Sequence, residues 1–79
     1  MPADNAYQFL ERVANDASLR AQFRSAGSAT IQATMDFALT KGFVFTEQDL
    51  RAAVATFPDN TTIDQLRDTW KIAKGARST

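Results

Sequence analysis

Apolar residues recur every three or four positions along most of this chain, which is the spacing of one face of an α-helix. Residues that favour helix caps and turns interrupt the pattern and divide it into five segments. Only residues 43–45 alternate as a strand would, and that run is too short to make a sheet. The pattern therefore predicts an all-α fold, a small bundle of about five short helices that forms a single domain over residues 1–79.

Two helices are expected in the first third of the chain. Asp4 or Asn5 is the predicted cap of the first helix, since both side chains accept hydrogen bonds from free backbone N–H groups. Its apolar face consists of Ala6, Phe9, Leu10, Val13 and Ala17. Asn15 and Asp16 break this face and are expected to cap a second, short helix. The apolar stripe of the second helix is Leu19, Phe23 and Ala26, and Gly27 is expected to end it.

The third and fourth helices have clear start and stop signals. Ser28 is the predicted cap of the third helix and Gly42 its end. One side of it carries Ile31, Thr34, Met35, Ala38 and Leu39, with Phe37 near the edge. Thr46 is expected to begin the fourth helix and to form a capping box with Asp49. The fourth stripe is Leu50, Ala53, Val54 and Phe57, and Pro58 ends the helix because it has no N–H to donate.

A fifth, additional helix is expected within residues 58–74, followed by a frayed tail at residues 75–79. Thr61 or Thr62 is its predicted cap. One face of it carries Ile63, Leu66, Trp70 and Ala73. Ile72 falls nearly opposite Ile63 on a helical wheel, which would give this helix a second apolar contact.

Large apolar side chains fill the joint between the third and fourth helices, where a polar loop is usual. Phe43 and Phe45 are expected on one side of an extended segment and Val44 on the other. Phe45 precedes the Thr46 cap and Leu50 follows it by four residues, which is the spacing of a hydrophobic staple. The joint therefore either fixes the angle between two helices or presents aromatic side chains to a binding partner.

The joint and the residues before it also resemble a known family. Residues 42–50 read GFVFTEQDL, which is similar to the Gly-aromatic-x-Phe-Thr-x-x-acidic-Leu signature of the Nif-eleven family. Residues 15–20, NDASLR, resemble its Asp-x-x-Leu-Arg step, and the similarity extends over about residues 5–57. The residues that carry the motif are Gly42, Phe43, Phe45, Thr46, Asp49 and Leu50.

The resemblance implies a small helical domain associated by name with nitrogen-fixation gene clusters. Many members serve as leaders of ribosomally made, modified peptides. The modifying enzyme binds the leader helix of such a peptide. In this chain Gly75-Ala76 is followed only by Arg77-Ser78-Thr79, and a fifth helix is predicted instead of a modifiable core. We therefore expect a free-standing member of the family without a core peptide.

Composition narrows the chemistry that the chain is expected to perform. It contains no Cys and no His, so thiolate catalysis, disulfides and the usual zinc sites are excluded. No glycine-rich phosphate loop is present, and Glu47 and Asp49 sit where acidic residues commonly stabilise a helix N-terminus. We expect no enzyme activity, no cofactor and no bound metal.

The remaining function classes are binding classes. We expect a cytoplasmic protein that binds a protein partner or itself, with Ile63, Leu66, Trp70 and Ile72 as partner-binding residues. A leader-like substrate of a peptide-modifying enzyme is the alternative. A DNA-binding helper that uses Arg67, Lys71 and Lys74 is less favoured, because nine basic residues are balanced by nine acidic ones. No run of apolar residues is long enough to suggest a membrane span.

Overall fold

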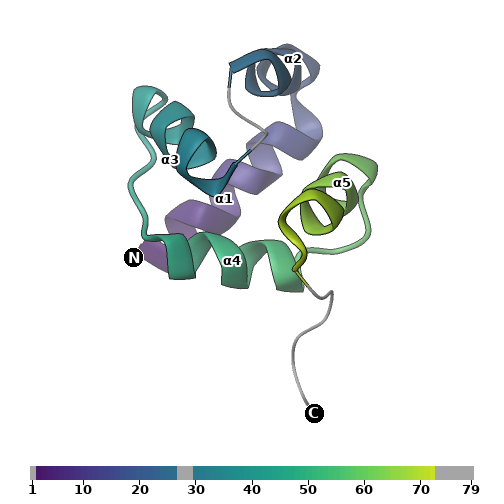
Figure 1. Cartoon of the computed structure of the whole chain (residues 1–79). Helices are drawn as coiled ribbons and strands as arrows, with labels where there is room; N and C mark the ends of the chain where they lie inside the picture. Colours follow the sequence, from purple (N-terminus) through teal and green to yellow (C-terminus); the bar gives the residue numbers. More distant parts are fainter. Residues whose placement is uncertain (1, 27–29, 73–79) are drawn as a thin grey trace.

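The computed structural model describes residues 2–26 and 30–72 of the 79-residue chain. Five α-helices make up the described part, and no strand occurs in it, so the all-α prediction is confirmed. The helices are α1 (Pro2–Asn15), α2 (Ala17–Ala26), α3 (Ile31–Thr40), α4 (Glu47–Thr56) and α5 (Thr61–Trp70). Helix α1 packs mainly against α4 and also against α2 and α5, while α3 packs against α2 and α4 (Figure 1).

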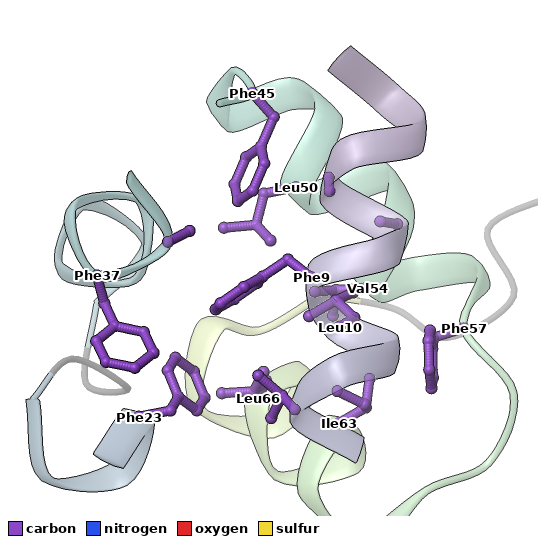
Figure 2. Close-up of a cluster of buried hydrophobic side chains, with 14 of the residues drawn as sticks. Phe9, Leu10, Phe23, Phe37, Phe45, Leu50, Val54, Phe57, Ile63 and Leu66 are labelled. Carbon is purple, nitrogen blue, oxygen red and sulfur yellow. The ribbon is translucent and has the colours of Figure 1, made fainter. Parts of the chain in front are cut away.

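One hydrophobic cluster joins all five helices and the joint before α4. Its fully enclosed side chains include Phe9, Leu10, Val13, Phe23, Leu50, Val54 and Ile63. Figure 2 shows the Phe9 ring inside this cluster, among side chains from several helices. Burying a side chain of this size stabilises the fold by about 1.5–3 kcal/mol relative to exposure, so this cluster supplies most of the driving force for folding.

The predicted helical faces are largely confirmed, with four residues corrected at their edges. Ala17 and Ala26 are exposed, and the Leu39 side chain is 60% exposed, although all were expected to face the core. Phe37, expected near the edge of its helix face, is buried instead and contacts the rings of Phe9 and Phe23. The sequence pattern predicts which side of each helix is apolar, but the packing of the neighbouring helices determines which residues on that side are buried.

Two predicted helix junctions are confirmed. The Asp16 carboxylate accepts a hydrogen bond from the Leu19 N–H at 3.1 Å, as expected for the residue that separates α1 from α2. Thr46 and Asp49 form a reciprocal capping box at the start of α4, with both hydrogen bonds at 3.1 Å. Each bond satisfies a backbone N–H that has no partner within its own helix.

Three predicted caps are wrong. Asp4 and Asn5 lie inside α1, which begins at Pro2, a residue whose fixed φ suits a first helical position. Thr30 caps α3, because its hydroxyl accepts from the Ala33 N–H, while the predicted Ser28 lies outside the described residues, as does Gly27. Asn60, and not Thr61 or Thr62, caps α5 by accepting from the N–H groups of residues 62 and 63.

The last helix is shorter than expected. It ends at Trp70 instead of continuing toward residue 74, because Lys71 adopts the left-handed conformation with φ 59°. The Ile72 N–H donates to the Arg67 carbonyl at 2.8 Å and the Lys71 N–H to the Asp68 carbonyl at 3.3 Å, which is the bond pattern of a Schellman motif. Ala73 and the predicted frayed tail at residues 75–79 lie outside the described residues.

Candidate functional site

The joint between α3 and α4 is held in place by its backbone. Gly42 has φ +90°, a conformation that costs a glycine little and other residues more. The Gly42 N–H donates to the Leu39 carbonyl at 3.0 Å, and the Phe43 N–H donates to the Ala38 carbonyl at 2.9 Å. These bonds form a Schellman motif, which ends α3 and directs the chain back along α1.

The side chains of the joint alternate as predicted. Phe45 is 7% exposed and belongs to the core, whereas Val44 is 62% exposed on the opposite side. Phe43 is half-buried, and the rings of Phe43 and Phe45 lie 5.6 Å and 5.9 Å from the ring of Phe9. Leu50, the other half of the predicted staple, is fully buried. The joint therefore anchors two helices and also places apolar atoms at the surface.

A shallow hollow of about 390 Å³ lies where the joint meets the outward side of α1. Its lining consists of Gln8, Glu11, Arg12, Asn15 and Phe43. All of these side chains except Phe43 are exposed. Beside the hollow, the Asn5 amide donates to the Val44 carbonyl at 3.1 Å and ties the joint to α1.

We call the set Gln8, Glu11, Arg12, Asn15, Phe43 and Val44 the joint surface. It combines amides, one carboxylate, one guanidinium and apolar atoms, a mixture that is common in protein interfaces. Its apolar members were expected from the motif, whereas its polar members were not. Residues 8, 11, 12 and 15 are spaced i, i+3, i+4, i+7, and this regular polar stripe is the signal that could have found them.

The comparison with protein families identifies this chain. The family model described as the Nif11 domain matches residues 1–50. The chain belongs to the Nif11 domain family. The match contains every residue of the predicted motif, from Gly42 to Leu50, and overlaps the expected segment 5–57. Neither the search of curated proteins nor the search of solved structures gave a match.

Helix α5 lies outside the part that matches the Nif11 domain, yet it is built into the same core. Ile63 is fully buried and Leu66 is 4% exposed, and both belong to the central cluster (Figure 2). Trp70 is half-buried against that cluster, and its indole N–H is enclosed without an acceptor among the described residues. A partner could reach Ile63 and Leu66 only if α5 left the bundle, so their predicted binding role stays a prediction.

Ile72 does not lie where the sequence pattern predicts it. It was expected on α5 opposite Ile63, where it would provide a second apolar side of the helix. The helix has already ended at Trp70, and the left-handed Lys71 turns the chain so that Ile72 packs half-buried against the core. A hydrophobic contact at this position commonly accompanies a Schellman motif.

Arg67 does not lie where the less favoured DNA-binding role would require it. It is 5% exposed and donates from Nη1 to the Val54 and Phe57 carbonyls, at 2.6 Å and 3.3 Å, and from Nη2 to the Asp64 carboxylate. The Val54 carbonyl would receive a helical bond from residue 58, but Pro58 has no N–H. Arg67 thus replaces the missing donor and is not available to phosphates or bases, and Lys74 lies outside the described residues.

Within residues 2–26 and 30–72 no helix has the length and apolar character that crossing a membrane requires. Within the same ranges no three acidic, His or Cys side chains come together as a metal site would require.

Proposed function

We propose that this Nif11 domain protein is a non-catalytic interaction domain that binds another protein molecule through the joint surface. The observation that carries the proposal is that the motif at residues 42–50 contains both buried and exposed apolar side chains. Phe45 and Leu50 fill the core, while the neighbouring Val44 is 62% exposed and Phe43 only half-buried. Apolar atoms held beside an exposed polar stripe give a partner both a hydrophobic contact and polar groups that fix its orientation.

The rigidity of the joint supports the proposal. Phe43 is fixed by its backbone bond to Ala38 and by ring contact with Phe9, and Val44 is fixed through its carbonyl by Asn5. A surface that is already ordered loses little conformational entropy when it binds. A cytoplasmic location is part of the same proposal, and fractionation of cells that produce the protein would test it.

Site-specific photocrosslinking tests the proposal. A photoreactive benzoylphenylalanine is placed at position 44 in cells that naturally produce the protein, and at the exposed position 56 in a matched control. We expect a crosslinked protein from position 44 that is absent or much weaker from position 56, and mass spectrometry identifies it. Equal crosslinking from both positions, or none from position 44, contradicts the proposal.

A second candidate function is supported by the family match over residues 1–50. Members of this small helical family often act as leaders for peptide-modifying enzymes, and such an enzyme would then be the protein that occupies the joint surface. The chain has no Cys, so modification would fall on other side chains, such as the hydroxyls of Ser and Thr. Intact-mass measurement of the protein from its native cells tests this, since loss of water or cleavage is expected and an unmodified full-length mass contradicts it.

A further inference from the structure

The outward side of α1 carries a polar stripe whose order is self-complementary. Gln8, Glu11, Arg12 and Asn15 line one hollow and are all exposed, so they share one face of the helix. The two charged residues lie at the centre of the stripe and the two amide residues at its ends. Reversing the direction of the helix exchanges Glu11 with Arg12 and Gln8 with Asn15.

The charges at the centre of this stripe have no partners within the described residues. Neither the Glu11 carboxylate nor the Arg12 guanidinium takes part in an ion pair there, whereas the exposed Arg51 on α4 pairs with Glu47 at 3.0 Å. Both groups are therefore free to pair with a second molecule.

We propose that a second copy of this chain occupies the joint surface, with the two α1 helices antiparallel about a two-fold axis between positions 11 and 12. In a two-fold interface each contact occurs twice, with the roles of the two chains exchanged. Glu11 then faces Arg12 of the partner subunit, and Arg12 faces Glu11 of the partner subunit. At the ends of the stripe, each Gln8 amide faces Asn15 of the partner subunit, and amides both donate and accept hydrogen bonds.

The apolar part of the joint surface fits the same arrangement. Phe43 lines the hollow together with the stripe, and the exposed Val44 follows it in the chain and is tied to Asn5 through its backbone carbonyl. Each copy would cover the other's Phe43 with the methylene groups of its α1 side chains and would remove Val44 from water. This inference deepens the proposed function by naming the partner, and it assigns self-association to α1 instead of α5, whose apolar residues Ile63 and Leu66 are buried in the core.

Charge exchange at positions 11 and 12 provides the test. The full-length protein is examined by sedimentation equilibrium over a range of concentrations, with circular dichroism to confirm that each variant is helical. We expect the wild type to dimerise, and Glu11→Arg or Arg12→Glu alone to weaken dimerisation by about tenfold or more, because each places like charges opposite one another. An equimolar mixture of the two variants should associate again, since every central pair in the mixed dimer has opposite charges. The double variant Glu11→Arg/Arg12→Glu should dimerise like the wild type for the same reason.

A matched control separates these effects from a general change in charge. Asp68→Arg alters the charge by the same amount as Glu11→Arg on the exposed side of α5 and should leave dimerisation unchanged. A wild type that remains monomeric, or a mixture and double variant that do not recover association, would overturn the inference. If the monomeric chain still crosslinks from position 44 to a different protein, the proposed function stands and only the self-association is rejected.

Discussion

Phe9 is the residue that brings the separate segments of the core together. It is fully buried on α1, and its ring lies within 6.2 Å of the rings of four other phenylalanines, namely Phe23, Phe37, Phe43 and Phe45. These partners come from α2, α3 and the joint, and Figure 2 shows Phe23, Phe37 and Phe45 of this set around Phe9. Tilted and edge-to-face ring pairs contribute about 0.5–1.5 kcal/mol beyond the burial of their area, so Phe9 couples the position of the joint to the packing of α1.

The first prediction concerns the phenylalanine that the joint contributes to the core. Phe45→Ala should lower the free energy of unfolding by about 3–5 kcal/mol, since it removes a buried ring that contacts Phe9. Val44→Ala is the matched control, and because Val44 is exposed, its effect should stay within about 0.5 kcal/mol. Urea denaturation of both variants measures the difference. Equal effects would mean that the two side chains do not face opposite sides.

The second prediction concerns Arg67. Arg67→Met keeps much of the side-chain volume but leaves the Val54 and Phe57 carbonyls without their donor, and Pro58 cannot replace it. We expect a loss of about 1–3 kcal/mol in unfolding free energy, the cost of a buried polar group left unsatisfied.

Arg51→Met provides the control for Arg67, because Arg51 is also paired with a carboxylate but is exposed. Exposed i,i+4 pairs contribute only about 0.3–0.5 kcal/mol, so this change should be small. Chemical denaturation monitored by circular dichroism compares the two variants. A loss for Arg67→Met no larger than that for Arg51→Met would show that the buried hydrogen bonds add no stability.

At the scale of elements, the sequence predicts helices best where one residue alone determines the boundary. Gly42 ends α3 through its positive φ. Helix α4 ends at Thr56, shortly before Pro58, because a proline has no N–H with which to continue the helix. Phe57 before it is extended, as the residue preceding a proline usually is. Such boundaries follow from covalent structure and need no knowledge of the neighbouring helices.

Boundaries were predicted less well where several capping residues lie next to one another. Asn60, Thr61 and Thr62 can all cap a helix, and the structure uses Asn60. Thr61 and Thr62 both lie inside α5, and Thr62 is buried there to 7% exposure, which the local sequence does not reveal. The same limit applies to Arg67, whose burial depends on how α5 lies against the end of α4.

The third prediction separates the observed cap of α5 from the expected one. Asn60→Ala removes the acceptor for the N–H groups of residues 62 and 63 and should cost about 1 kcal/mol of unfolding free energy. Thr61→Ala changes an exposed residue that is the first of the helix and should cost much less. Thermal melts of both variants measure the effects. A larger loss for Thr61→Ala would restore the sequence-based assignment of the cap.

The candidate site was predictable only in part. The aromatic motif pointed to residues 43–45, and alternation correctly gave the exposed position of Val44. The polar stripe on α1 went unrecognised because polar residues on an amphipathic helix are ordinarily read as a solvated face. The stripe becomes a candidate binding surface only because the joint lies beside α1. That placement depends on a contact between residues 5 and 44, which are far apart in the sequence.

At the scale of the whole molecule, α5 completes a core that the rest of the chain leaves open. In the structure α5 packs against both α1 and α4 (Figure 1). It inserts Ile63 and Leu66 into the central cluster (Figure 2). The segment that matches the Nif11 domain, residues 1–50, therefore ends before the core is complete.

The last prediction follows from this incomplete core. A chain shortened to residues 1–58 loses the buried Ile63 and Leu66. Truncating such a side chain to alanine already lowers the free energy of unfolding by about 2–5 kcal/mol, and here both residues are removed completely. It also loses the Arg67 donor at the end of α4. At roughly 0.05–0.15 kcal/mol per residue, the 79-residue protein has only about 4–12 kcal/mol of stability, so the loss consumes most or all of it.

We therefore expect the 1–58 fragment to lack a cooperative unfolding transition. It should bind a hydrophobic dye and retain some of the circular dichroism signal of a helix. A fragment of residues 1–72 is the control, because it keeps every residue of the central cluster and should melt in one cooperative transition. Thermal melts followed by circular dichroism in both the near and the far ultraviolet distinguish the two outcomes. A cooperative melt of the 1–58 fragment would show that the first four helices close their own core and would leave α5 free to bind a partner.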